Sequence, residues 1–157
     1  MIATIRFTTR WPPNPASLVI ARLGGSKLFS HCMTIIDDIA YEATMTHGCR
    51  VVPLEVAMQG VSKYQDMYVP ITDKSGAIQF GLEQDGKGYD FWGVLGLPLL
   101  ASEDWADDSR WWCSEHVFMM LGAGGTWLFD PDVVKRVTPA HVLMSNFKKS
   151  EIETYEK

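Results

Sequence analysis

The chain has 157 residues, of which 46% are hydrophobic and 21% are charged, as expected for one globular domain with a single core. Its net charge is −5, and its basic residues form only isolated pairs such as Lys148-Lys149, which are too short to follow a phosphate backbone. We therefore expect no nucleic-acid binding. No apolar stretch reaches the roughly 18 residues that a transmembrane helix needs, so none is predicted.

The N-terminal residues 1–10 alternate apolar and polar side chains, a pattern typical of a β-strand with one buried face. They lack the charged start, apolar middle and cleavage site of a signal peptide, so we expect this segment to be retained. The three cysteines, at positions 32, 49 and 113, form no disulfide pattern and favour a reducing compartment. The sequence thus predicts a cytoplasmic location.

Turn and capping residues divide the rest of the chain into short helices and strands. In chain order, we predict a helix at 14–24, strands at 29–36, 39–44 and 48–53, a helix at 54–60, a strand at 67–71, helices at 72–85 (capped by Thr72) and 89–100, an acidic loop at 103–108, a helix from Trp111 or Cys113 to Gly122, a strand at 127–129, a helix at 138–147 and a loosely held tail at 148–157. The strands form an antiparallel meander and the helices are largely separate from them. The predicted class is therefore α+β, with an antiparallel sheet packed against helices in one domain of residues 1–157.

Cys113 stands at the start of a predicted helix and on its apolar face, since Val117, Met120 and Leu121 follow it at helical spacing. The N-terminal end of a helix presents free backbone N–H groups and a partial positive charge, which favour a thiolate and can hold an oxyanion. Cys113 is therefore a candidate nucleophile. A buried cysteine that only fills core space is the alternative that this pattern leaves open.

His31 lies within a strand-like apolar run and is predicted to share one face with Phe29, Met33 and Ile35. A polar imidazole on an apolar face needs a hydrogen-bonding partner. His31 is therefore a candidate functional residue and not simply part of the core.

Glu42 on the next predicted strand is the candidate partner of His31. If Asp37-Asp38 is the tip of an even-membered loop, Glu42 is the diagonal neighbour of His31 and can hydrogen-bond to it, whereas an odd-membered loop would place it on the other face. A base oriented by a carboxylate is what a cysteine nucleophile requires. We predict His31 as the base and Glu42 as the residue that orients it, with Thr44 and His47 as alternatives to Glu42.

Four short segments, in this order, resemble the circularly permuted papain-like hydrolases related to the NlpC-type peptidases and to lecithin:retinol acyltransferase. They are FSHCMTI at 29–35, which is similar to the histidine strand; AYEA at 40–43, similar to the strand with the third polar residue; YDFWG at 89–93, similar to an aromatic-glycine stretch; and WCSE at 112–115, similar to the nucleophile motif. The resemblance spans residues 29–121. Cys32-Met33 departs from it, because Gly-Val-type residues often follow the histidine in the family.

The resemblance implies a permuted papain-like fold and a cysteine peptidase or amidase that acts through an acyl-cysteine intermediate without a cofactor. Cys113, His31 and Glu42 would be catalytic, and Tyr89 would donate a hydrogen bond to the oxyanion or the substrate. Trp112, within a tryptophan-rich segment, is a candidate for lining the substrate groove or for the core. A peptidoglycan peptide is the implied substrate, and a phage or bacterial product the implied source.

Three other interpretations remain open at this level. The same three residues would serve a lipid thioesterase or an acyltransferase, and a virion-associated or binding domain would retain the fold without catalysis. Cys32, His47, Cys49 and His31 could supply zinc ligands, but they lack a recognised zinc spacing, so no metal is predicted. His116, one helical turn after Cys113, is a second candidate partner for the thiol or a partly exposed surface group.

Overall fold

The computed structural model describes residues 1–11, 28–90, 110–133 and 137–155. The predicted helix at 14–24, nearly all of that at 89–100, and the acidic loop at 103–108 lie outside these residues. None of the helices in the described part of the chain is long and apolar enough to cross a membrane.

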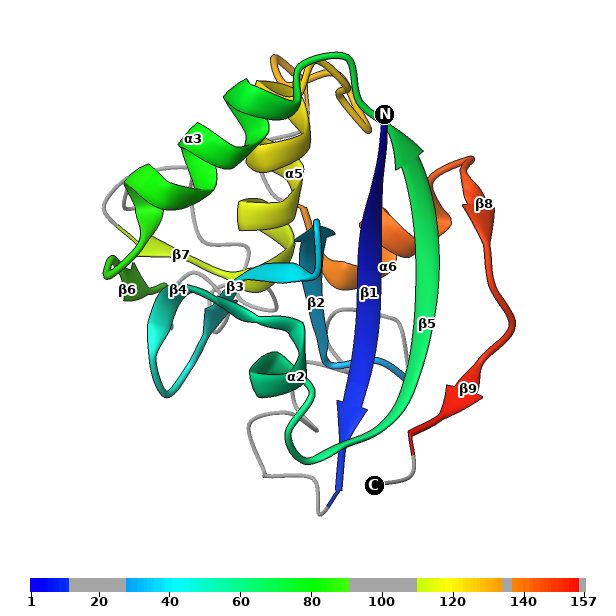
Figure 1. Ribbon diagram of the computed structural model, residues 1–157. Helices are drawn as coiled ribbons and strands as arrows, with labels where there is room; N and C mark the ends of the chain where they lie inside the picture. Colours follow the sequence, from blue (N-terminus) through cyan, green and yellow to red (C-terminus); the bar gives the residue numbers. More distant parts are fainter. Residues whose placement is uncertain (12–27, 91–109, 134–136, 156–157) are drawn as a thin grey trace.

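Most of the described strands belong to one seven-stranded antiparallel sheet (Figure 1). Its order is β4-β3-β2-β1-β5-β8, and β9 also pairs with β5. These strands are β1 (Ile2–Arg10), β2 (His31–Ile36), β3 (Ile39–Thr44), β4 (Gly48–Pro53), β5 (Val61–Pro70), β8 (Lys148–Lys149) and β9 (Glu153–Thr154). Two short strands, β6 (Gly88–Tyr89) and β7 (Arg110–Trp111), pair in parallel as a second sheet. The predicted α+β class with an antiparallel sheet is confirmed.

The hairpin of β2 and β3 turns at Asp37-Asp38, as predicted. Both aspartates have positive φ angles, 51° and 61°, which is the conformation of the two-residue turns that match the twist of a hairpin. The loop is thus even-membered. The pairing ends at Thr34 and Tyr41, so β2 and β3 are no longer paired where they carry His31 and Glu42.

Four helices complete the described structure: α2 (Leu54–Ala57), α3 (Lys74–Gln84), α5 (Cys113–Ala123) and α6 (Pro139–Met144). Helix α5 packs against β2 and β3, and both α3 and α6 pack against α5. The main core fills the space between the sheet and these helices, and Phe7, Met67, Val117 and Leu121 are almost fully buried within it. Burial of the apolar face of α5 is therefore what fixes its position on the sheet.

The opposite face of β2 is covered by α2. Met33 and Ile35 form a small core there with Ala57, while Cys32 and Ile36, which alternate with them, belong to the main core. Phe29 also belongs to the main core, so the prediction that it shares a face with Met33 is wrong. The reason is that β2 begins only at His31, and the alternation does not extend back to Phe29.

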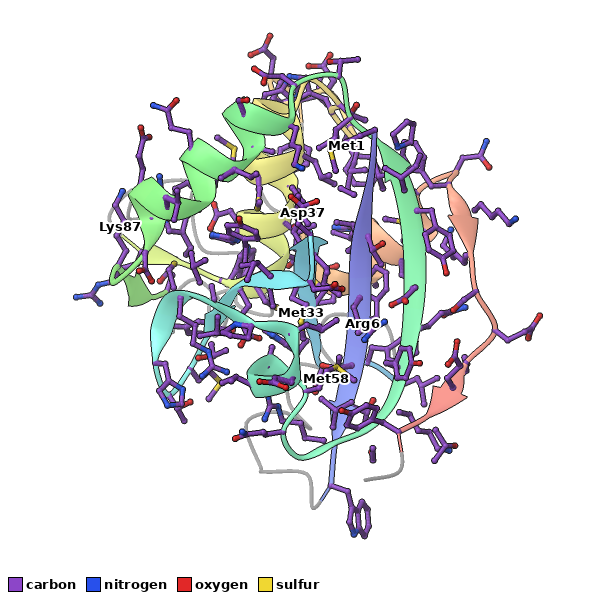
Figure 2. The ribbon with its side chains drawn as sticks, viewed as in Figure 1. Met1, Arg6, Met33, Asp37, Met58 and Lys87 are labelled. Carbon is purple, nitrogen blue, oxygen red and sulfur yellow. The ribbon has the colours of Figure 1, made fainter. Side chains whose placement is uncertain are left out.

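Polar contacts connect the strands and α2 on the face of the sheet that α2 covers. Arg6 on β1 forms two hydrogen bonds of 2.7 Å with the carboxylate of Asp66 on β5, and its guanidinium lies 4.1 Å from the ring centre of Tyr64. The Nη1 atom of Arg6 is also 3.7 Å from the sulfur of Met58, just after α2 (Figure 2). These contacts join β1, β5 and the end of α2 outside the main core.

The sheet extends further at one edge than the sequence predicts. Strand β5 begins at Val61 and not at 67, and the tail at 148–157, expected to be loosely held, contributes β8 and β9 to its edge. The Tyr64 hydroxyl also donates a hydrogen bond to the carboxylate of Glu153. Backbone pairing at an exposed edge needs no apolar alternation, so the sequence carries no hydrophobic signal for it.

Three predictions about helix ends and late strands are also corrected. Asp73, and not Thr72, caps α3, because its carboxylate accepts a hydrogen bond of 2.8 Å from the backbone of Gly76. Residues 127–129 are not a strand; the Trp127 ring instead packs on Phe118 of α5 at 5.1 Å between ring centres. Helix α6 begins where predicted but ends at Met144, well before 147.

Candidate active site

Cys113 is the first residue of α5, and its side chain is buried, with 3% of the residue exposed. Trp112 occupies the N-cap position in an extended conformation and provides no side-chain cap. The helix is held at this end by Ser114, whose hydroxyl donates a hydrogen bond of 2.6 Å to the carbonyl of Val137. The backbone N–H groups of the first turn have no partner within the helix, which leaves a positive electrostatic potential around the thiol.

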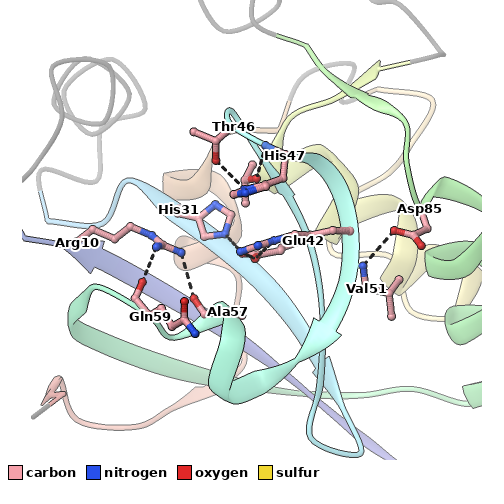
Figure 3. A network of polar contacts seen from close by, with 11 residues as sticks. Arg10, His31, Glu42, Thr46, His47, Val51, Ala57, Gln59 and Asp85 are labelled. Carbon is pink, nitrogen blue, oxygen red and sulfur yellow. Dashed lines mark hydrogen bonds and ion pairs between the residues drawn. The ribbon is translucent and has the colours of Figure 1, made fainter. Parts of the chain in front are cut away.

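His31 contacts Glu42 directly, as the predicted hairpin register requires. The Nε2 atom of His31 is 2.6 Å from Oε2 of Glu42, and the carboxylate is fully buried (Figure 3). The His31 side chain is 14% exposed, so one part of the ring remains open to solvent. Because Nε2 is occupied by Glu42, Nδ1 is the ring nitrogen that remains for the Cys113 thiol.

Arg50 on β4 binds the other oxygen of Glu42. It lies directly opposite Glu42 in the β3–β4 pairing, and its Nε and Nη2 atoms are 2.8 Å and 2.6 Å from Oε1. Burial alone would raise the pKa of Glu42, but the hydrogen bonds and positive charges of His31 and Arg50 outweigh it and lower the pKa to about 2. Glu42 is therefore a carboxylate at any ordinary pH.

The turn between β3 and β4 sets this opposition of Glu42 and Arg50. Gly48 begins β4 with a φ of 68°, and a side chain there would overlap the backbone carbonyl of Lys87 at 2.2 Å. The neighbouring Cys49 donates its backbone N–H to that same carbonyl at 2.8 Å. Only glycine allows β4 to pass this close to the chain before β6, so Gly48 supports the register that places Arg50.

The Cys113 thiol interacts electrostatically with two consecutive residues of β2, His31 and Cys32. Consecutive side chains of a strand point to opposite faces, so a thiol that reaches both lies at the edge of β2 and not over either face. That edge is available because the pairing of β2 with β3 stops at Thr34. Because the two strands separate there, the N-terminal end of α5 can approach His31.

These contacts favour an ion pair between Cys113 and His31. The hydrogen bond from Cys32, together with the hydrogen bond and charge of His31, holds the pKa of Cys113 well below its usual range despite burial. Burial opposes a charge on His31 as well, but hydrogen bonds to Cys113 and Glu42 raise its pKa to about 9. Burial and the Cys113 charge raise the pKa of Cys32 well above its usual range, so Cys32 remains a neutral S–H donor.

Tyr89 lies near this pair, in β6 and not in the helix predicted to begin there. With His31 it lines a pocket of about 250 Å³. Burial and the nearby charge of Cys113 raise the pKa of Tyr89, so its phenol is a neutral hydrogen-bond donor. Trp112 packs against Tyr89 and Met45 and is 5% exposed, which places it in a small apolar cluster beside the thiol.

Thr44 and His47, the alternatives to Glu42, and His116, the second candidate partner of the thiol, form other contacts. The Nδ1 atom of His47 is 2.8 Å from the Thr46 hydroxyl, and Thr44 accepts a hydrogen bond from the backbone of His47. His116 is 1% exposed and packs on the ring of Phe80, and burial lowers its pKa to about 4. The interpretation of His116 as a surface group is therefore wrong, because α5 is covered on that side by α3.

The zinc interpretation gains no support from the part of the chain that the structure describes. No three His, Cys, Asp or Glu side chains there are grouped so that they could hold a metal ion. All three cysteines are free and buried.

Sequence reasoning missed Cys32 and Arg50 as members of this site. The sequence indicates Cys32 only as a possible metal ligand, although Cys32 directly follows His31. Gly48 could have indicated Arg50. A tight turn that ends at Gly48 pairs β3 with β4 so that Arg50 lies opposite Glu42. A buried carboxylate between two cations is in fact the electrostatic centre of the site.

In comparisons with known proteins, no family model and no curated protein matches this chain.

Proposed function

We propose that the protein is a cysteine hydrolase that cleaves an amide bond through an acyl-cysteine intermediate. The observation that carries this proposal is the chain of contacts from Cys113 to His31 to Glu42, which joins a helix N-terminus to two strands 70 or more residues away in the sequence. A cysteine that only filled core space would need neither a charged imidazole nor a buried carboxylate beside it.

The proposed reaction has two steps. The Cys113 thiolate attacks the carbonyl carbon, and the backbone N–H groups at the start of α5, with the Tyr89 hydroxyl, stabilise the oxyanion. The C–N bond then breaks as the His31 imidazolium gives its proton to the leaving amine, which leaves an acyl thioester on Cys113. Water attacks this thioester, His31 takes the proton of that water, and the acid product leaves with the thiolate restored.

Glu42 acts through His31 in this scheme and is a positioning residue. It bonds Nε2 and so directs Nδ1 toward the thiol, and its negative charge favours the imidazolium. Arg50 in turn holds the carboxylate, so the imidazole is oriented by a group that is itself fixed from two sides.

We propose a permuted papain-like fold and a peptide substrate, with peptidoglycan peptides as the first class to examine. The support is the chain order, since the histidine strand precedes the nucleophile helix, together with the antiparallel sheet against which α5 packs. The likeness of the segments at 29–35, 40–43 and 112–115 to the NlpC-related hydrolases agrees with this order.

Alkylation by iodoacetamide, mapped by mass spectrometry, tests the proposal. Labelling is measured from about pH 5 to about pH 9, and Cys113 is expected to react fast even near pH 5, well below the pKa of about 8.5 of an ordinary thiol. Cys49 is the internal control, because burial raises its pKa to about 11. Replacement His31→Ala should move the reactivity of Cys113 to higher pH. If Cys113 reacts no faster than Cys49, the protein is not a cysteine hydrolase.

Acyl transfer is tested directly with p-nitrophenyl acetate. The expected result is a burst of p-nitrophenol and an acetyl group on Cys113, followed by slower release of acetate. Cys113→Ser and Cys113→Ala should abolish the burst, whereas Cys49→Ala should keep it. A burst that survives Cys113→Ala would contradict the assignment of the nucleophile.

A further inference from the structure

The pocket beside His31 has a positively charged lining. It has a volume of about 250 Å³, and the cationic side chains of Arg10, His31 and Arg50 line it together with other residues that include His47 and Tyr89. No Asp or Glu occurs among the described residues of this lining. The whole chain has a net charge of −5, so the positive charge is concentrated at the place where a substrate would meet His31.

Among the described residues of the site, Arg10 supplies the positive charge that no other group offsets. The charge of Arg50 is offset by Glu42 at 2.6 Å, and that of His31 by the Cys113 thiolate. The Arg10 guanidinium instead donates to two neutral backbone carbonyls, those of Gln59 at 2.5 Å and Ala57 at 3.1 Å (Figure 3). Within the described chain, no carboxylate forms an ion pair with it.

The two carbonyl contacts of Arg10 also hold it in place. They fix the end of a long side chain between β1 and the C-terminal end of α2. A guanidinium has five N–H donors in a rigid plane, so donors remain for a ligand after these two bonds. Arg10 is thus an oriented cation at the edge of a pocket, which is the arrangement that binds carboxylates in proteins.

We infer that this pocket selects substrates that carry a carboxylate next to the bond to be cleaved, and that Arg10 is the residue that binds it. The inference rests on the proposed function, for which it names a substrate class: acyl groups or peptides with an acidic residue beside the scissile bond. Neutral substrates would lack this attraction, and cationic substrates would be repelled.

Two alkylating reagents of nearly equal size test the selection. Iodoacetate carries a carboxylate where iodoacetamide carries a neutral amide, so the ratio of their rates at Cys113 reports the charge preference. Arg10→Gln should lower this ratio about fivefold at low ionic strength. Arg10→Lys should retain most of the ratio, because it keeps the charge. The matched control Lys148→Gln removes one positive charge on β8 and should not change the ratio.

A binding measurement makes the test independent of catalysis. In the Cys113→Ala variant, the imidazole NMR signals of His31 and His47 are followed while N-acetylglycine or its neutral analogue N-acetylglycinamide is added. N-acetylglycine should shift both signals at concentrations where the amide does not, and Arg10→Gln should weaken its binding about fivefold.

The outcomes separate the two proposals. If Cys113 reacts fast but Arg10→Gln leaves the iodoacetate preference unchanged, the carboxylate selection is wrong and the hydrolase proposal stands. If Cys113 is unreactive, the hydrolase proposal is wrong, and the NMR titration alone decides whether the pocket prefers a carboxylate. Equal binding of N-acetylglycine and N-acetylglycinamide would overturn the inference in either case.

Discussion

Replacing Glu42 by glutamine removes one negative charge from the centre of the site while keeping the shape of the side chain. The fully buried carboxylate bonds His31 at 2.6 Å and Arg50 at 2.6 and 2.8 Å, so the variant leaves two cations without their shared partner. Breaking a buried ion pair by removing one partner is strongly destabilising. We expect Glu42→Gln to lower both the free energy of unfolding and the pKa of His31.

The magnitude follows from the pKa of Glu42, which is about 2 in the folded protein against an ordinary value of 4.5. A difference of one in pKa corresponds to about 1.4 kcal/mol, so the charged carboxylate stabilises the fold by about 3 kcal/mol at pH 7. The folded pKa is the lower one, so this contribution is complete above about pH 5 and is lost as the pH falls toward 2. The difference in stability between wild type and variant should therefore shrink in acid.

Urea unfolding at pH 7 and at pH 3 measures this difference. The control Glu151→Gln removes the same charge from an exposed position and should cost little. His31 should titrate near pH 9 by NMR in the wild type and nearer to 6.5 in Glu42→Gln, and Cys113 should need a higher pH to react. Equal stability of the two variants, with an unchanged pKa of His31, would refute the role assigned to Glu42.

Two further substitutions separate the other contributions to the site. Cys32→Ala removes the S–H donor to the Cys113 thiolate and should raise the pKa of Cys113, seen as slower iodoacetamide labelling near pH 6, whereas Cys32→Ser keeps a donor and should largely restore the labelling rate. If the alanine variant labels like the wild type, Cys32 has no influence on the thiolate. Tyr89→Phe should slow acetylation of Cys113 by p-nitrophenyl acetate about tenfold or more but not its alkylation, because alkylation forms no oxyanion. Equal slowing of both reactions would instead indicate a structural effect of the missing hydroxyl.

Local patterns in the sequence were sufficient to predict the central elements of the fold. The alternation of residues 1–10 corresponds to strand β1, the Asp37-Asp38 pair to the observed hairpin turn, and the Thr138-Pro139 cap to the start of α6. These features depend on backbone geometry and on burial of one face, both of which act between near neighbours in the chain. The contact of His31 with Glu42 was also predicted from the even-membered turn, although β2 and β3 are no longer paired at these two residues.

The contact of Cys113 with β2 was not determined by any local pattern. Among the described residues, four strands and two helices lie between Glu42 and Cys113 in the chain. The thiol reaches His31 and Cys32 only because β2 and β3 separate at Thr34 and because α5 packs on both strands. The β5 edge strands at the C-terminus were missed for a related reason. Their pairing uses backbone hydrogen bonds with few apolar side chains.

By itself, the sequence predicted Cys113, His31 and Glu42 as the candidate site residues and the arrangement of the hairpin that carries His31 and Glu42. Only the tertiary structure decided that Arg50 neutralises Glu42, that Cys32 donates to Cys113, and that Arg10 lines the pocket beside His31. The physical reason is that charge and hydrogen bonding act through space at a few ångströms. Residues far apart in the chain acquire these partners only when burial of the core brings their strands and helices together.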